Sequence, residues 1–162
     1  MVLEPWTDLR VVDLYAGSGA LGIEALSRGA AFVDFAEHGR HALTALTANL
    51  EALGLGDDCA RVWRVELPSG LGRMREALER ADVVLMDPPY GGSDARRALE
   101  ALGRAAALPA GCRVALEHHA KDDMPVATAA LERIAERRYG ETHITFYGPR
   151  REDRSALEEP GA

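Results

Sequence analysis

The stretch from Asp13 to Gly22 reads DLYAGSGALG and carries glycines at positions 17, 19 and 22, the spacing G-x-G-x-x-G. It follows the apolar run LRVVDLY and leads into ALGIEALSRG, where apolar residues recur at helical spacing. A strand, a glycine-rich turn and a helix in this order are typical of the first unit of a Rossmann-like fold. There the helix N-terminus offers N–H groups to an anion. The spacing alone also fits a tight turn without a ligand.

Asp13 bears on which ligand the turn would take. It ends the predicted strand, where its negative charge would repel the pyrophosphate of a redox dinucleotide. S-adenosylmethionine carries an ammonium and a sulfonium, which a carboxylate attracts, while the helix N-terminus can receive its carboxylate. We therefore predict a methyl-donor site formed by Asp13, Tyr15, Gly17 and Gly19. The alternative is that Asp13 only caps the turn by accepting backbone N–H groups.

Length and composition place the chain among ordinary globular proteins. Its 162 residues fit one domain, and its net charge of −7 indicates no broad basic surface. Cys59 and Cys112 lie far apart and match no metal-binding spacing, so we predict reduced thiols and no metal. The sequence has no apolar run of bilayer length and no signal-peptide pattern at its start. We expect a soluble, cytoplasmic protein.

Short apolar runs alternate with amphipathic segments, which predicts an α/β domain with a mainly parallel sheet. The predicted strands cover residues 10–15, 31–36, 60–65, 82–87, 113–118 and 143–148. The predicted helices, after the one that follows the glycine turn, cover residues 39–54, 69–81 and 93–108. Residues 126–139 suit a helix but could end in a strand before Gly140, and both possibilities stay open.

Two glutamates end predicted strands at positions that matter in nucleotide-binding folds. Glu37 ends the second strand, twenty residues after Gly17, where an acidic side chain meets ribose hydroxyls. Glu66 follows the third strand, where such folds present a group to the adenine. We predict that both bind the donor; the alternative is that each is a solvated surface carboxylate.

The stretch VVLMDPPYGG ends the fourth strand with Asp87, Pro88, Pro89 and Tyr90. Two prolines cannot continue the hydrogen bonds between strands, so the chain leaves the sheet at the carboxyl end of this strand. In a doubly wound sheet the fourth strand lies beside the first strand. There the Asp87 side chain and the Pro88 carbonyl can accept hydrogen bonds from an exocyclic amine. Tyr90 can stack on a base, an interaction worth about 1 to 3 kcal/mol. The alternative is a rigid turn with a packed tyrosine.

With these stretches, the chain resembles the RsmD family, the bacterial guanine-N2 methyltransferases of 16S ribosomal RNA. The resemblance rests on VVDLYAGSGALGIEALSRGA, MDPPY and RRYGETHITFY, and covers about residues 9–148. It implies a Rossmann-like class I methyltransferase fold: a seven-stranded, mostly parallel sheet with helices on both faces and an antiparallel last strand at HITFYG. Part of LERIAERRYG would then be a strand.

The resemblance also implies a function. S-adenosylmethionine would be the donor, and Asp87, Pro88, Pro89 and Tyr90 would hold the N2 amine of a guanine. The partner would be 16S ribosomal RNA or the small ribosomal subunit, with no membrane involved, and we expect a monomer. Because Asp-Pro-Pro-Tyr serves any planar exocyclic amine, methylation of adenine N6 in DNA or RNA is an alternative. A donor-binding domain without catalysis is another.

The sequence departs from the family pattern in two places. Glu66 stands where relatives usually have Asp or Asn beside the adenine, so its role is open. Relatives also carry a longer N-terminal segment with a basic hairpin that grips RNA, and almost none of it precedes Leu9 here. Three interpretations are open: the chain is shortened, its start is misassigned, or the protein has lost its grip on RNA. We expect a methyltransferase domain over residues 1–148 and a disordered tail over 149–162.

Overall fold

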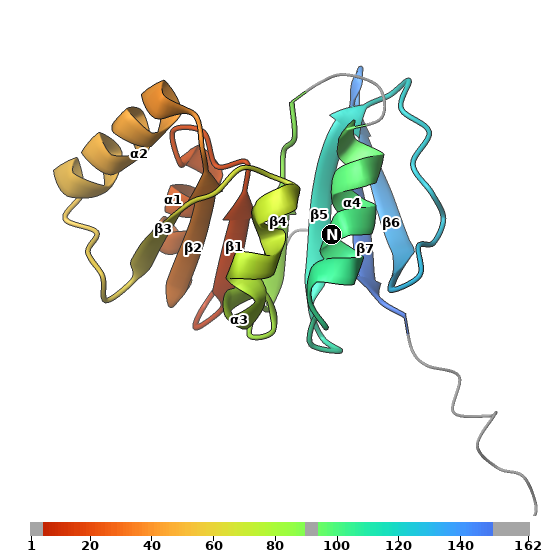
Figure 1. The fold of residues 1–162 in the computed structure, drawn as a ribbon, viewed down its shortest axis with the longest axis horizontal. Coiled ribbons are helices and arrows are strands. Elements are labelled where there is room, and N and C mark those ends of the chain that lie inside the picture. Colours follow the sequence, from red (N-terminus) through yellow and green to blue (C-terminus); the bar gives the residue numbers. More distant parts are fainter. Residues whose placement is uncertain (1–4, 90–93, 151–162) are drawn as a thin grey trace, which may run out of the picture.

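The fold is built on one seven-stranded sheet, described in a computed structural model for residues 5–89 and 94–150. The strands lie in the order β3-β2-β1-β4-β5-β7-β6 (Figure 1). Their bounds are β1 Arg10–Leu14, β2 Phe32–Glu37, β3 Ala60–Arg64, β4 Val83–Met86, β5 Arg113–His119, β6 Leu131–Tyr139 and β7 Thr142–Pro149. The first five run parallel, and β7 is antiparallel to both β5 and β6. The predicted sheet, with its antiparallel last strand, is confirmed.

Helices cover both faces of this sheet, as expected. They are α1 Ala20–Ser27, α2 Arg40–Ala52, the 3₁₀ segment η1 Ser69–Met74, α3 Arg75–Leu78 and α4 Asp94–Ala105. In Figure 1, α3 and α4 lie in front of the sheet and α1 lies behind it. No helix in the described ranges is both long and apolar enough to cross a lipid bilayer.

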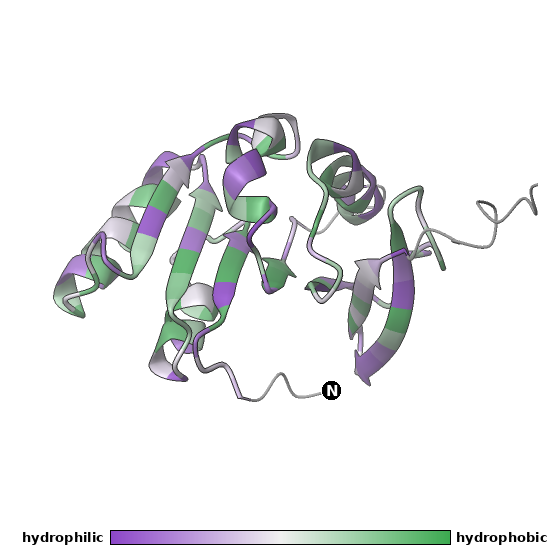
Figure 2. Cartoon of the chain, turned by 90° about the horizontal axis from the view of Figure 1, so that it is seen from below, coloured by the Kyte–Doolittle hydropathy of each residue, from purple (hydrophilic) through white to green (hydrophobic). Residues whose placement is uncertain are grey.

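Each face of the sheet has its own apolar core. Leu78, Leu99 and Leu102 pack with strand residues such as Tyr147 on the face of α3 and α4. Leu46 and Leu50 of α2 belong to the other core, together with Phe35, which is fully buried. Figure 2 shows hydrophobic residues along the strands in the middle of the sheet and hydrophilic bands on the outermost strand at its right. Burial on both faces explains why the parallel strands read as continuous apolar runs.

Two segments differ from the helical pattern of their sequence. Residues 69–81 form η1 and a single turn of α3 in place of the predicted continuous helix. Gly70 and Gly72 lie at the start of this segment, and glycine lowers the stability of a helix interior. At residues 126–139 the helical alternative is wrong, because Leu131–Tyr139 forms β6 and pairs with β7. Pairing with a neighbouring strand overrides local propensity here.

The third glycine of the G-x-G-x-x-G stretch serves packing. A Cβ at Gly22 would lie 2.3 Å from Cε1 of Phe35 and 2.8 Å from Cγ1 of Val33, both in β2. Both neighbours are fully buried and have no room to move away. Glycine at position 22 therefore lets α1 pack directly on the sheet.

We predict that Gly22→Ala lowers the free energy of unfolding by about 1 to 3 kcal/mol, the usual cost of overpacking a core. Gly72→Ala is the matched control, because a Cβ there meets no atom within 4 Å. Urea unfolding of the wild type and both variants measures the difference. Equal stability of the two variants would contradict the packing role of Gly22.

Candidate active site

The predicted site residues gather at the carboxyl edge of the parallel strands. Asp13 is in β1, Glu37 ends β2, and Asp87 directly follows β4. Strand β4 lies beside β1, so the sheet order reverses between them, which is where ligands bind in open α/β sheets. The glycine turn and the Asp-Pro-Pro segment are therefore neighbours, as predicted from the doubly wound order.

Asp13 lies beneath the glycine turn and is 1% exposed. Its Oδ2 accepts a hydrogen bond of 3.0 Å from the backbone N–H of Gly22. Burial raises the pKa of Asp13 to about 7; the bond from Gly22 lowers it, and the charges of Asp87 and Glu37 raise it further. Asp13 thus makes the turn-capping contact and also lies in the field of two other carboxylates.

Glu37 joins the glycine turn to the start of α2. Its Oε2 accepts the N–H of Gly17 at 2.9 Å, and its Oε1 accepts the N–H groups of His38 at 2.8 Å and Gly39 at 2.7 Å. The two oxygens of a carboxylate offer about four acceptor positions. One position therefore stays available for a hydroxyl group of a ligand.

The two glycines predicted to bind the donor have different surroundings. Gly17 has a φ of +58°, and a Cβ there would meet no atom within 4 Å, so the turn is open at this point. Gly19 is buried, and a Cβ there would lie 2.4 Å from Cδ1 of Leu46. Gly17 is the position where a ligand can approach the backbone, whereas Gly19 makes room for α2.

Tyr15 and Glu66, the other two residues predicted to bind the donor, have different surroundings from this cluster. Tyr15 has a φ of +64°, a left-handed conformation that is uncommon for residues other than glycine. Its side chain packs against the core on the α4 face, and burial, with the charge of Asp94, raises its pKa to about 12. Glu66 is exposed, and its backbone carbonyl accepts the N–H of Gly70 at 2.7 Å.

The Asp-Pro-Pro segment, residues 87–89, begins with a half-buried carboxylate. Asp87 is partly exposed, Pro88 is buried and Pro89 is exposed. Burial raises the pKa of Asp87, and the charge of Glu117 raises it further. Tyr90 lies outside the described residues.

Glu117 is a residue of this edge that sequence reasoning missed. It lies near the end of β5, and it is half-buried like Asp87. The signal was present in the stretch VALEHH, which has an acid near the carboxyl end of a strand beside the Asp-Pro-Pro segment. Finding it required the strand order, which puts β5 next to β4.

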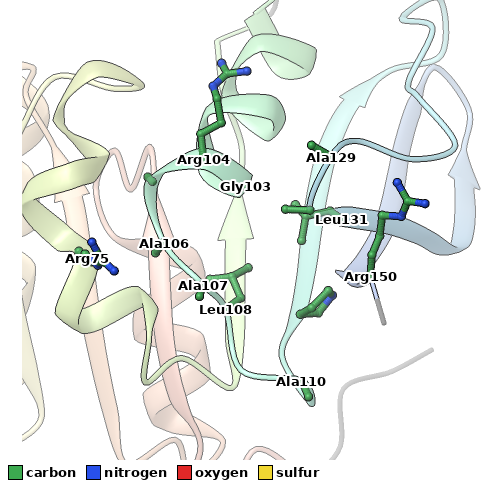
Figure 3. A pocket seen from close by; sticks show the side chains of 13 residues that line it. Arg75, Gly103, Arg104, Ala106, Ala107, Leu108, Ala110, Ala129, Leu131 and Arg150 are labelled. Atoms are coloured by element: carbon green, nitrogen blue, oxygen red, sulfur yellow. The ribbon is translucent and has the colours of Figure 1, made fainter. Parts of the chain in front are cut away.

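Two surface hollows lined by described residues lie outside this cluster. The larger, of about 750 Å³, has Arg75, Arg104 and Arg150 around a floor of alanines and leucines (Figure 3). It lies where α4 ends and β6 begins, at the amino edge of the sheet. The smaller, of about 560 Å³, lies along α2 and includes His38, Arg40 and Arg64. Neither contains Asp13, Glu37 or Asp87.

Comparison with known proteins identifies similar sequences and structures. A family model described as "Conserved hypothetical protein 95" matches residues 2–148. The "Putative rRNA methyltransferase YlbH" of Bacillus subtilis is 29% identical over 141 residues, which cover 87% of this chain and 76% of that protein. The "Ribosomal RNA small subunit methyltransferase D" of Escherichia coli K12 is 35% identical over 83 residues, 51% of this chain and 39% of that protein.

A solved structure has the same architecture. The structure titled "Putative methyltransferase yhhF from Escherichia coli" superposes with a TM-score of 0.75 at 28% identity, over 89% of this chain and 78% of that chain. The matched part of each relative differs in length. The chain matches about three quarters of the Bacillus subtilis protein but less than half of the Escherichia coli methyltransferase D.

We predict that Asp13 makes the protein less stable as the pH rises from about 4 to 7. The pKa of Asp13 is about 7 in the folded state against an ordinary value of 3.8, so folding favours the protonated form. Stability from this group is present below the ordinary pKa and is lost as the pH rises through the folded pKa. Asp13→Asn removes the titration and keeps an oxygen for the N–H of Gly22.

Urea unfolding at pH 5 and pH 7.5 measures this effect. The wild type should lose roughly 2 to 3 kcal/mol more than Asp13→Asn over this interval. Parallel pH profiles of the two proteins would show that Asp13 is not held in an unfavourable charge state.

Proposed function

The chain belongs to the RsmD-like family described as Conserved hypothetical protein 95, and on that basis we propose that it methylates the N2 amine of a guanine in small-subunit ribosomal RNA. Relatives named as ribosomal RNA methyltransferases support the reaction class and the kind of acceptor. S-adenosylmethionine is the donor. The residues at the carboxyl edge of the sheet have to explain why the acceptor is the N2 amine of guanine.

The observation that carries the proposal is the set of carboxyl groups, Asp13, Glu37 and Asp87, gathered around the glycine turn. Asp13 and Asp87 both have raised pKa values, and the charges of Asp87 and Glu37 contribute to the rise at Asp13. A cation placed among these carboxylates lowers their pKa values and is itself attracted. The pyrophosphate of a redox dinucleotide would add to the repulsion.

The residues present fit S-adenosylmethionine in three respects. Gly17 leaves the turn open for a ligand, Glu37 keeps an acceptor position for a hydroxyl, and Asp13 contributes negative charge from beneath the turn. The donor's ammonium and sulfonium match that charge. Asp13, Tyr15, Gly17, Gly19 and Glu37 would hold the donor, and Glu66, which is exposed, would have a lesser share. When bound, the donor supplies an electrophilic methyl group.

The Asp-Pro-Pro segment would hold the acceptor amine. The Asp87 carboxylate and the Pro88 carbonyl each accept one N–H of the amine, which orients the nitrogen lone pair. Because the methyl group is already strongly activated, the chain needs to supply orientation and exclusion of water more than a strong base. Tyr90, in the same segment, would stack on the base.

An exposed arginine and an exposed tyrosine lie in β6, at the outer edge of the sheet. In the register of β7 with its neighbours, Ile144 lies opposite both Glu117 and Arg137, so these side chains share one face of the sheet. Tyr139, two residues beyond Arg137 in β6, is 62% exposed on the same face. An exposed cation and an exposed ring on this face suit single-stranded RNA.

We predict that the chain binds S-adenosylmethionine and does not bind NADH, as measured by isothermal titration calorimetry. Asp13→Asn should weaken donor binding about tenfold or more, because it removes a buried charge near the cationic ligand. Glu66→Gln is the matched control, since it removes the same charge from an exposed side chain, and should change affinity less than about threefold. Binding of NADH alone would exclude the methyl-donor function.

We predict that Asp87→Ala slows methyl transfer about 100-fold or more while donor affinity changes little, since the side chain is assigned to the amine. Asp57→Ala, which removes an exposed carboxylate ahead of β3, should retain full activity. Initial rates with small-subunit RNA and titration of the donor separate the two effects. Unchanged turnover in Asp87→Ala would remove this segment from the mechanism.

The experiment that tests the whole proposal is mass spectrometry of small-subunit RNA from cells with and without this protein. The proposal expects N2-methylguanosine to disappear at one position without the protein. Loss of N6-methyladenosine in its place would favour the adenine alternative.

A further inference from the structure

The larger of the two surface hollows, of about 750 Å³, has three arginines and no acidic residue among the described residues that line it. Arg75 begins α3, Arg104 lies in the last turn of α4, and Arg150 follows the end of β7. The other lining residues are alanine, glycine, proline and leucine. The whole chain has 26 acidic and 19 basic residues, so this purely basic lining runs against its composition. The smaller hollow, by contrast, includes Glu51.

The three guanidinium groups surround an apolar floor. All three arginines are exposed. Figure 3 shows Arg75 and Arg150 on opposite sides of Ala107 and Leu108, with Arg104 at the end of α4 above this floor in the view. We call this feature the arginine hollow. A ligand resting on its floor lies within reach of cations from three separate elements.

Described residues neutralise these arginines only in part. The Nε of Arg75 forms an ion pair of 2.7 Å with Oε1 of Glu79. Arg150 donates from Nη1 to the carbonyl oxygen of Thr128 at 3.3 Å, a contact that orients the side chain and leaves its charge in place. Arg104 has no ion-pair partner within residues 5–89 and 94–150. Since a guanidinium has five N–H donors, most of the donors in the arginine hollow are available to a ligand.

The ligand that this lining suits combines negative charge with a compact, largely apolar body. Guanidinium groups bind phosphates in a bidentate manner and stack on the planes of bases. The alanines and leucines of the floor can contact a ribose and a base. In a duplex the bases are stacked inside, so only a single strand can turn a nucleotide into a hollow. Single-stranded RNA therefore matches the arginine hollow in charge and in shape.

The arginine hollow lies on the opposite edge of the sheet from the predicted donor and acceptor residues. The end of α4 and the start of β6 are at the amino edge, whereas Asp13, Glu37 and Asp87 are at the carboxyl edge. Strand β5, with seven residues, separates the two edges by about 20 Å. RNA held here would not compete with the methyl donor. It would instead have a second attachment point on a chain whose net charge of −7 otherwise repels it.

We propose that the arginine hollow binds a single-stranded segment of the RNA substrate away from the reacting guanine, with Arg104 and Arg150 contacting its phosphates. This inference rests on the proposed function, which makes RNA the partner. The arginine hollow contributes affinity for RNA and takes no part in methyl transfer itself.

Fluorescence anisotropy with a labelled single-stranded RNA of about 12 nucleotides, titrated at several salt concentrations, tests the proposal. Each phosphate contact adds about 0.7 to the slope of log K against log salt for a single strand. Arg104→Gln and Arg150→Gln should each lower this slope by about 0.7 and weaken binding about fivefold at 0.1 M salt. Arg61→Gln is the matched control. It removes the same charge from an exposed side chain of β3, at the far edge of the sheet, and should change neither quantity.

Further measurements separate RNA binding from stability and from other occupants. Arg104 lies in the last turn of α4, where a cation also stabilises the helix end, so thermal unfolding and donor titration accompany each variant. Arg150 lies outside the helices, and loss of affinity in Arg150→Gln has no such cause. Duplex RNA and an oligoglutamate peptide of the same length serve as competing ligands.

The outcomes distinguish this inference from the function on which it rests. Reduced slopes in the Arg104 and Arg150 variants, with Arg61→Gln unchanged and the single strand preferred over both competitors, support it. Wild-type slopes in both variants overturn it. So does tighter binding of duplex RNA or oligoglutamate that depends on the same arginines, because the occupant is then a duplex or an acidic protein segment. The proposed function fails separately, if cells without the protein keep all their N2-methylguanosine while RNA binding still depends on these arginines.

Discussion

The hydrogen bond from the Gly22 N–H to the buried Asp13 carboxylate is the contact on which the site depends. At 3.0 Å it joins the end of β1 to the first turn of α1 across the glycine turn. Burying a carboxylate is unfavourable, and the raised pKa of Asp13 records that cost. One backbone N–H offsets only part of it, so Asp13 keeps its proton up to about pH 7 unless a cation lies beside it.

The carboxyl groups at this edge of the sheet connect the fold to the chemistry. Glu37 shares its oxygens among three backbone N–H groups and fixes the shape of the turn, and Asp87 stands on the neighbouring strand. A doubly wound sheet brings the ends of β1, β2 and β4 together whatever side chains they carry. The fold therefore brings these acidic residues together, and their carboxyl groups favour a cationic ligand such as the proposed S-adenosylmethionine.

The sequence was sufficient for most of the fold because buried parallel strands have a distinct apolar pattern. It could not decide residues 126–139, where a helical pattern competes with pairing to β7, and only the family resemblance indicated the strand. The positions of Asp13, Glu37 and Asp87 at one edge of the sheet could be predicted because each lies at or next to the end of a strand, near glycines or prolines. The position of Glu117 could not, because only the strand order, a property of the folded chain, places β5 next to β4.

The charge state of Asp13 links the buried contact to the donor, so its titration tests the account most directly. Carbon-13 NMR of labelled aspartate carboxyls, followed against pH, gives the pKa of Asp13 with and without S-adenosylmethionine. The account predicts a pKa of about 7 in the free protein and a fall of about two units or more when the cationic donor is bound. A pKa near the ordinary 3.8 in the free protein, or one that the donor leaves unchanged, would contradict it.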